Sequence, residues 1–179
     1  MALIDPINGH YVTLRCVEPS DAEFTLAIRN NEELTKYIPK VNGTLDTQRK
    51  WIENQQKKAG DYFFIIQKNN GSPAGTISFY DVDPSTGVCE LGRYISLGNA
   101  LENVEAAVML VDYIFQEAGL KKIILHSDEN NKKIMNFWIK MGAVFEHNVE
   151  MDGWTASRYG LTPELYKEKR PKVVKLLKI

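Results

Sequence analysis

The sequence predicts a mixed α/β (α+β) fold with a mostly antiparallel central sheet flanked by helices. Three observations support this prediction. Three apolar runs in the middle of the chain are separated by short turns, which is typical of an antiparallel meander. A long stretch with the periodicity of an amphipathic helix follows them. After this stretch, runs with strand and helix character alternate, as expected for a mixed layout.

The N-terminal part of the chain contains one predicted strand and two predicted helices. Residues 10–17, HYVTLRCV, alternate between apolar and polar side chains as a half-buried strand does. Residues 18–30 form the first predicted helix, for which Ser20 or Asp21 is a suitable N-cap. Residues 45–58 form a second helix, which is more polar than the first.

The predicted meander occupies the middle of the chain. Its strands span residues 61–68, 76–83 and 89–96, and its turns span residues 69–75 and 84–88. Both turns contain glycine and proline, which are typical of tight connections. Because the connections are short, neighbouring strands must run in opposite directions.

The long helix that follows the meander is identified by its apolar spacing. Five apolar residues recur at spacings of 3, 4, 3 and 4, which places them on one face of a helix. Gly119 is the predicted C-terminal stop. The five residues are Leu101, Val104, Val108, Val111 and Phe115.

The last third of the chain alternates between the two kinds of element. Residues 121–128 form a buried strand and residues 130–142 a short helix. Residues 143–162 form a hairpin turned at Asp152-Gly153. We expect a single domain over residues 1–179, with a basic helical tail from about residue 163.

Composition excludes several classes of protein. The 179 residues carry a net charge of −1, which argues against non-specific binding to nucleic acid. No apolar run approaches the roughly 20 residues that span a membrane. Cys16 and Cys89 form no metal-binding pattern, so we expect no metal site and a cytoplasmic, reducing location. His10, His126 and His147 stand apart in the sequence and are interpreted as structural residues.

The segment from Ser127 to Leu161 carries the most specific pattern. Asn131 begins a helix that ends at Lys140 and Gly142, and the following hairpin finishes at Tyr159-Gly160-Leu161. This pattern and the order of elements resemble the GCN5-related N-acetyltransferase (GNAT) superfamily. The resemblance covers about the whole chain. It is strongest to the branch that acetylates ribosomal-protein N-termini and, in some members, amino sugars on nucleotide carriers.

The resemblance implies that acetyl-CoA is the co-substrate. Backbone groups of Tyr94, Ile95 and Ser96 would contact its pantetheine arm and its acetyl carbonyl, the latter as in an oxyanion hole. The amides at the start of the long helix would bind its diphosphate, since helix N-termini attract anions. The residues implied there are Asn99, Ala100, Leu101, Glu102, Asn103 and Val104.

This loop departs from the family pattern. Asn99 and Leu101 stand where the family has glycines, and Gly98 lies one place early. Two interpretations remain open. In the first, the amides still bind phosphate and Glu102 points to solvent. In the second, Glu102 and Glu105 offset the helix dipole, and the coenzyme binds weakly or not at all.

Glu90 is the candidate catalytic base, because it lies on the strand where family members admit the coenzyme. The alternative is a structural pair with a neighbour such as Arg93. Trp138 occupies the position at which many family members have a tyrosine that protonates the leaving thiolate. An indole cannot act as such an acid, so we expect Trp138 to pack in the core or along the coenzyme. Asn131 either contacts the coenzyme or serves as an N-cap.

The acceptor amine should approach from the first two helices and the last hairpin. The favoured acceptor is a small primary amine, with a nucleotide-linked amino sugar as the candidate. The alternatives are a protein N-terminal amine and a non-catalytic acyl-CoA-binding module. No nucleic acid or membrane partner is expected, and a homodimer is left open. The candidate acceptor-binding residues are Arg29, Asn30, Tyr37, Trp154 and Arg158.

Overall fold

The computed structural model describes residues 4–151 and 153–178. Within these residues, eight strands form one sheet in the order β1-β2-β3-β4-β5-β6-β8-β7, and only β5 and β6 run parallel. The predicted fold class is therefore confirmed. The strands are β1 (Ile7–Asn8), β2 (Val12–Cys16), β3 (Tyr62–Lys68), β4 (Pro73–Asp83), β5 (Val88–Ser96), β6 (Lys122–Asp128), β7 (Val144–Met151) and β8 (Trp154–Leu161).

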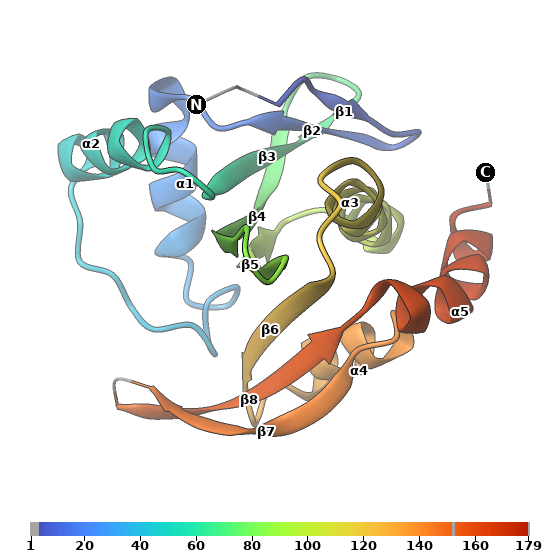
Figure 1. The fold of residues 1–179 in the computed structure, drawn as a ribbon. Helices are drawn as coiled ribbons and strands as arrows, with labels where there is room; N and C mark the ends of the chain where they lie inside the picture. The colour runs from blue at the N-terminus through green and yellow to red at the C-terminus, as the bar shows by residue number, and fades with distance from the viewer. Residues whose placement is uncertain (1–3, 152, 179) are drawn as a thin grey trace.

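Helices cover both faces of this sheet. In Figure 1, α1 and α2 lie on one side of β3 and β4, and α3 lies on the other side. One core cluster packs between the sheet and α3, α4 and α5, and a smaller one packs beneath α1 and α2. The helices are α1 (Ala22–Arg29), α2 (Leu45–Gln55), α3 (Ala100–Asp112), α4 (Lys132–Lys140) and α5 (Pro163–Val174).

Helix ends follow local capping chemistry, except that the side chain of the predicted N-cap of α1 does not bond to that helix. Asp21 is the N-cap of α1, whereas Ser20 lies in a short 3-10 turn before it. The Asp21 side chain makes no capping bond to α1, because it accepts two hydrogen bonds from Arg15. The long helix α3 continues as a π-helical turn, η2 (Tyr113–Glu117), and Gly119 follows at φ +66° in the left-handed region. The predicted stop is confirmed.

The strand predicted over residues 10–17 is β2, which begins two residues later than predicted, and the short strand β1 before it was not predicted. His10 and Tyr11 are not in β2, because their backbone N–H groups donate to the carboxylate of Glu105 on α3. Val12 donates to the same carboxylate as β2 begins. A side chain reaching from α3 therefore holds the start of β2.

The sheet divides between its two parallel strands. Pairing of β5 with β6 runs only from Val88 to Glu90, opposite Lys122–Ile124. Beyond Glu90, β5 stays with β4 and β6 pairs with β8, so the two strands diverge. Arg93 adds to this divergence, because it sits at φ +50° where β5 has one extra residue relative to β4.

Buried tyrosines should make the fold sensitive to alkali. Burial raises the pKa of Tyr80, Tyr94 and Tyr166, and each hydroxyl donates a hydrogen bond inside the fold. The unfolded chain releases these protons near pH 10, well before the folded chain does. We therefore expect the free energy of unfolding to fall as pH rises through about 10, measured by urea denaturation from pH 8 to 11. Tyr166→Phe should reduce that fall, and an equal fall in the variant would contradict the prediction.

Candidate functional site

Three cavities surround the region where β5 and β6 diverge. We call the first the wide cavity; it measures about 440 Å³ and lies between the end of β5, the start of α3 and α4. The cleft cavity, about 150 Å³, lies between β5 and β6. The side cavity, about 240 Å³, lies under α1 and α2. Ile95 lines both the wide and the side cavity, and Arg93 lines both the cleft and the side cavity.

Glu90 faces a histidine across the parallel pair. Because Glu90 lies opposite Ile124 in the sheet, the residue two places along β6, His126, shares its face. The Nδ1 atom of His126 lies 3.1 Å from Oε2 of Glu90, although it makes no hydrogen bond to a described group. Both side chains are largely buried, with 13% and 24% of their area exposed. Sequence reasoning treated His126 as structural and missed this contact.

Tyr80 holds the other oxygen of the same carboxylate. Its hydroxyl donates to Oε1 of Glu90 at 2.6 Å. Burial raises the pKa of Tyr80 far above its usual range, and the charge of Glu90 raises it further. Tyr80 therefore remains a hydrogen-bond donor at neutral pH, and it fixes the orientation of the carboxylate.

Arg93 does not pair with Glu90; the neighbours that contact the Glu90 carboxylate are Tyr80 and His126. Its guanidinium binds the buried carboxylate of Asp61 through two hydrogen bonds, of 2.6 and 3.0 Å, and lies 4.2 Å from the centre of the Tyr80 ring. Backbone strain of the kind seen at Arg93 is held in place by such surrounding contacts. Arg93, held by Asp61, thus packs against the ring of Tyr80, whose hydroxyl binds Glu90.

The pair of Glu90 and His126 can move a proton. A carboxylate and an imidazole 3.1 Å apart can each accept a proton, so together they can act as a base toward a group in the cleft. His126 lines the cleft cavity, while Glu90 lies behind it on β5. The site therefore has the chemistry of a general base open to the space between the two strands.

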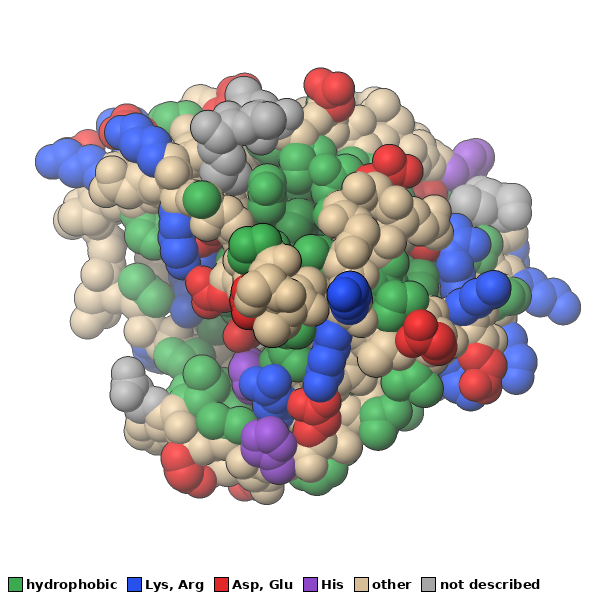
Figure 2. Space-filling view, in the orientation of Figure 1, with side chains coloured by type: hydrophobic (Ala, Val, Ile, Leu, Met, Phe, Trp, Pro, Cys, Tyr) green, Lys and Arg blue, Asp and Glu red, His purple; other side chains and the backbone are tan. Residues whose placement is uncertain are grey.

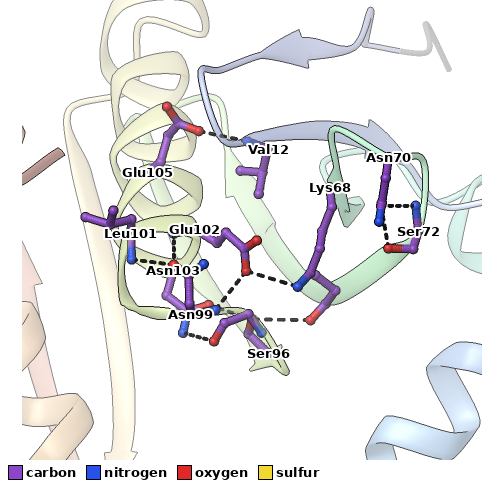
Figure 3. A network of polar contacts seen from close by, with 12 residues as sticks. Val12, Lys68, Asn70, Ser72, Ser96, Asn99, Leu101, Glu102, Asn103 and Glu105 are labelled. Atoms are coloured by element: carbon purple, nitrogen blue, oxygen red, sulfur yellow. Dashed lines mark hydrogen bonds and ion pairs between the residues drawn. The ribbon is translucent and has the colours of Figure 1, made fainter. Parts of the chain in front are cut away.

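The amides at the start of α3 are already bonded to side chains of the same loop. Asn99 accepts from the N–H groups of Leu101 and Glu102, and the Glu102 carboxylate accepts from the N–H of Asn99 at 2.8 Å. The N–H of Gly98 donates to the hydroxyl of Ser96. Figure 3 shows this closed network, with the Glu102 side chain turned toward Lys68. An anion that binds the N–H groups of Asn99, Leu101 or Glu102 must displace a side chain.

Glu102 does not point to solvent, so that expectation is wrong. It is only 8% exposed, and its carboxylate lies 3.4 Å from the Lys68 ammonium. It forms a capping box with Asn99, which satisfies two of the amides that a helix start leaves unpaired. Gly98 lies close beside it: a Cβ there would lie 3.0 Å from the carboxylate and 2.9 Å from Asn103 Oδ1, so a larger residue would have to move these two side chains.

The structure brings most of the predicted coenzyme contacts together. The wide cavity is lined from β5 and α3, with Asn131 on its opposite side. Asn99, Leu101 and Glu102 line none of the three cavities. The predicted contacts that β5 and α3 place on the wide cavity are Tyr94, Ile95, Ser96, Ala100, Asn103 and Val104.

Asn131 and Trp138 lie where α4 meets the cavities. The side chain of Asn131 caps α4 by accepting from Ile134 N–H at 3.4 Å, and the residue also lines both the wide and the cleft cavity. Trp138 is 5% exposed and contacts Tyr94 edge-on, with ring centres 6.3 Å apart. Trp138 also lines the cleft cavity, so it packs in the core and forms part of the wall.

The predicted acceptor-binding residues separate into different places. Arg29 lines the side cavity, and Tyr37 and Trp154 line the cleft cavity. Asn30 is exposed at the end of α1, and Arg158 pairs with Glu146 at 2.9 Å. Neither of these two residues lines any of the three cavities.

The surface outside the cavities is mixed in charge. In the face shown in Figure 2, basic and acidic side chains are interspersed. Within residues 4–151 and 153–178, no group of three or more His, Cys, Asp or Glu side chains is placed to hold a metal ion. Of the helices described, none has the length and apolar character needed to cross a bilayer.

Comparison with known proteins gives consistent matches. The family described as "Acetyltransferase (GNAT) domain" matches residues 12–144. Apo FdhC, described as a nucleotide-linked sugar GNAT, is 27% identical with a TM-score of 0.77 over 98% of each chain. A search of curated proteins gives no significant match.

Two further solved structures share the fold at lower identity. A putative acetyltransferase from T. thermophilus is 18% identical with a TM-score of 0.82 over 99% of each chain. Spermidine N-acetyltransferase from Vibrio cholerae, in complex with CoA and spermine, is also 18% identical, with a TM-score of 0.78. It covers 88% of this chain and 98% of its own. At this identity the likeness concerns the fold alone.

Proposed function

Because the chain belongs to the GNAT acetyltransferase family, we propose that it transfers the acetyl group of acetyl-CoA to the primary amine of a small molecule. The favoured acceptor is an amino sugar, and one linked to a nucleotide in particular. The observation that carries this proposal is the contact between Glu90 and His126 at the point where β5 and β6 diverge. It provides a proton acceptor beside a cleft that adjoins the wide cavity.

The wide cavity suits the coenzyme in part. Acetyl-CoA supplies an activated acetyl thioester when it is bound. The pairing of β5 with β6 ends at Glu90, before Tyr94, Ile95 and Ser96. On the side toward β6, the backbone of these three residues is therefore a free strand edge along the wide cavity, and it can bind a pantetheine arm. The fit is poorer at the start of α3, where Glu102 and Asn99 already occupy the amides that would hold a diphosphate.

Glu90 and His126 handle the proton of the acceptor amine. Tyr80 keeps the Glu90 carboxylate oriented toward His126, and His126 faces the cleft in which the amine must lie. The proton passes to this pair, directly or through a water molecule, as the amine attacks.

Tyr94 and Trp138, which line the cleft cavity, are poorly suited to protonate a departing thiolate. The hydroxyl of Tyr94 donates to the carbonyl of Asn103 at 2.8 Å, and burial raises the pKa of Tyr94. Trp138 carries an indole N–H, which is not an acid at neutral pH. Since a thiol has a pKa of about 8.5, a thiolate can leave without a proton donor.

Similarity supports the choice of acceptor. The 27% identical FdhC is described as a nucleotide-linked sugar GNAT, and its match extends over nearly all of both chains. The match to spermidine N-acetyltransferase is only 18% identical and carries no weight for the substrate. An amino sugar therefore remains the favoured acceptor.

One observation favours a second candidate function. The closed hydrogen-bond network at the start of α3 would weaken binding of a diphosphate, as expected of an acyl-CoA-binding module without catalysis. The buried pair of Glu90 and His126 has no evident purpose in such a module. We therefore place the catalytic function first.

Thermal unfolding with acetyl-CoA tests whether the coenzyme binds, and CoA release tests whether the acetyl group is transferred. A ligand present at 100 times its Kd should stabilise the fold by about 2.7 kcal/mol. If acetyl-CoA binds, a thiol reagent then reports CoA release against a panel of amino sugars and amines. Absence of stabilisation at millimolar acetyl-CoA would overturn both candidate functions. Binding without CoA release against the whole panel would favour the second candidate.

Replacing Glu102 by Gln should strengthen coenzyme binding. The change removes a negative charge beside the amides of α3 and releases Lys68 to meet a phosphate. We expect a gain of about 1 kcal/mol, or roughly a fivefold lower Kd for CoA, by titration calorimetry. Pantetheine, which lacks the diphosphate, should bind both forms equally. Weaker CoA binding by Glu102→Gln would show that the carboxylate does not compete with the ligand.

A further inference from the structure

The side cavity contains a positive charge that no described acid neutralises. Arg29, in the last turn of α1, lines this cavity, and its guanidinium donates to the carbonyl of Pro39 at 2.8 Å. Within the described chain, no carboxylate lies within 4.0 Å of it. A guanidinium has five N–H donors, so most of its bonding capacity remains for a ligand. Burial lowers the pKa of Arg29, which marks a partly desolvated cation.

The rest of the cavity wall is mainly apolar and aromatic, with the uncharged polar residues Thr25, Gln48 and Thr76 and without an acidic side chain. Trp51 and Phe63 meet edge to face there, with ring centres 5.5 Å apart, and Trp51 is 40% exposed. The second cation of the wall, Arg93, is already neutralised by its two bonds to Asp61. The cavity therefore offers one unpaired positive charge beside an accessible aromatic ring.

The side cavity adjoins the place of reaction. Ile95 is shared with the wide cavity, and Arg93 is shared with the cleft cavity that His126 lines. These shared residues place the side cavity directly beside the two cavities that flank the bulge of β5.

We propose that the side cavity binds the anionic part of the acceptor, a phosphate or a carboxylate, through Arg29, with a flat ring of the acceptor against Trp51. This inference rests on the proposed function and deepens it by naming the substrate class: an amine that carries an anionic group. A guanidinium binds either kind of anion through two parallel hydrogen bonds. A polyamine does not fit, since the cavity would place it against cations and offer no acid.

Binding of simple probes can test this proposal without turnover. Trp51 lies in the cavity wall, so its fluorescence reports occupancy; Trp51→Phe identifies its share of the signal. We would titrate the full chain with UDP, uridine, benzoate and spermidine, with CoA absent and with CoA saturating. UDP and benzoate distinguish a phosphate from a carboxylate as the preferred anion. The expected result is binding of at least one of these two anions, with uridine and spermidine at least tenfold weaker.

Variants of two arginines complete the test. Arg29→Gln should raise the Kd of the bound anion at least tenfold, and Arg29→Lys should fall between it and the original chain. Arg49→Gln, on the exposed face of α2 and outside the cavity, is the matched control and should change nothing. Unchanged binding in Arg29→Gln, failure of both anions to bind, or spermidine binding as tightly would overturn the proposal. If CoA failed to bind while an anion still bound through Arg29, the proposed function would be refuted but the anion site in the side cavity would remain supported.

Discussion

Glu90→Gln is expected to lower turnover by about 10²- to 10⁴-fold, the range that a positioned general base contributes. Gln keeps the size of the side chain and can still accept the Tyr80 hydrogen bond, but it cannot accept a proton from the amine. Glu90 does not line the wide cavity, so the Kd for acetyl-CoA should stay within about twofold, a difference of roughly 0.4 kcal/mol. Steady-state CoA release and titration calorimetry measure the two quantities.

The controls for this prediction separate chemistry from folding. Glu117→Gln changes an exposed carboxylate in the turn after α3 and should leave both quantities unchanged. His126→Asn should also lower turnover, because it removes the group that joins Glu90 to the cleft. Full activity of Glu90→Gln would reject Glu90 as the base.

Glu105→Ala is expected to cost about 3 kcal/mol of unfolding free energy, because charged hydrogen bonds to three backbone amides are lost at once. These amides belong to His10, Tyr11 and Val12, with N···O distances of 2.7, 2.6 and 2.9 Å. Val12 is fully buried, so its amide has no access to replacement water. For a chain of this length, the midpoint of thermal unfolding should fall by roughly 6–12 °C.

Two further variants should lose less stability than Glu105→Ala. Glu105→Gln keeps one oxygen acceptor and should cost less than Glu105→Ala. Glu117→Ala removes an exposed carboxylate just beyond the same helix and should stay within about 0.5 kcal/mol of the original chain. If Glu105→Ala unfolded at the same urea concentration as Glu117→Ala, the carboxylate would not be what holds the β1–β2 turn to α3.

The loop before α3 shows where sequence reasoning reached its limit. The replacement of glycines by Asn99 and Leu101 indicates an altered anion site, and this much is visible in the sequence. Glu102 turns inward because its carboxylate accepts from the N–H of Asn99, in a capping box between residues three apart that the sequence analysis did not recognise. Its ion pair with Lys68, from the distant strand β3, became clear only once the sheet placed that lysine beside the helix.

The sequence by itself determined the order of strands and helices from β2 onward, the amphipathic stripe of α3 and its stop at Gly119, but it did not show the two-residue strand β1. Spacing, capping residues and turn residues act over a few positions, so they can be read locally. Only the tertiary structure decided that Glu90 faces His126, that Glu105 holds amides 95 residues away, and that Arg29 meets no described acid. These contacts depend on the parallel pairing of β5 with β6 and on the packing of helices against the sheet. No local pattern encodes which distant side chains such packing brings together.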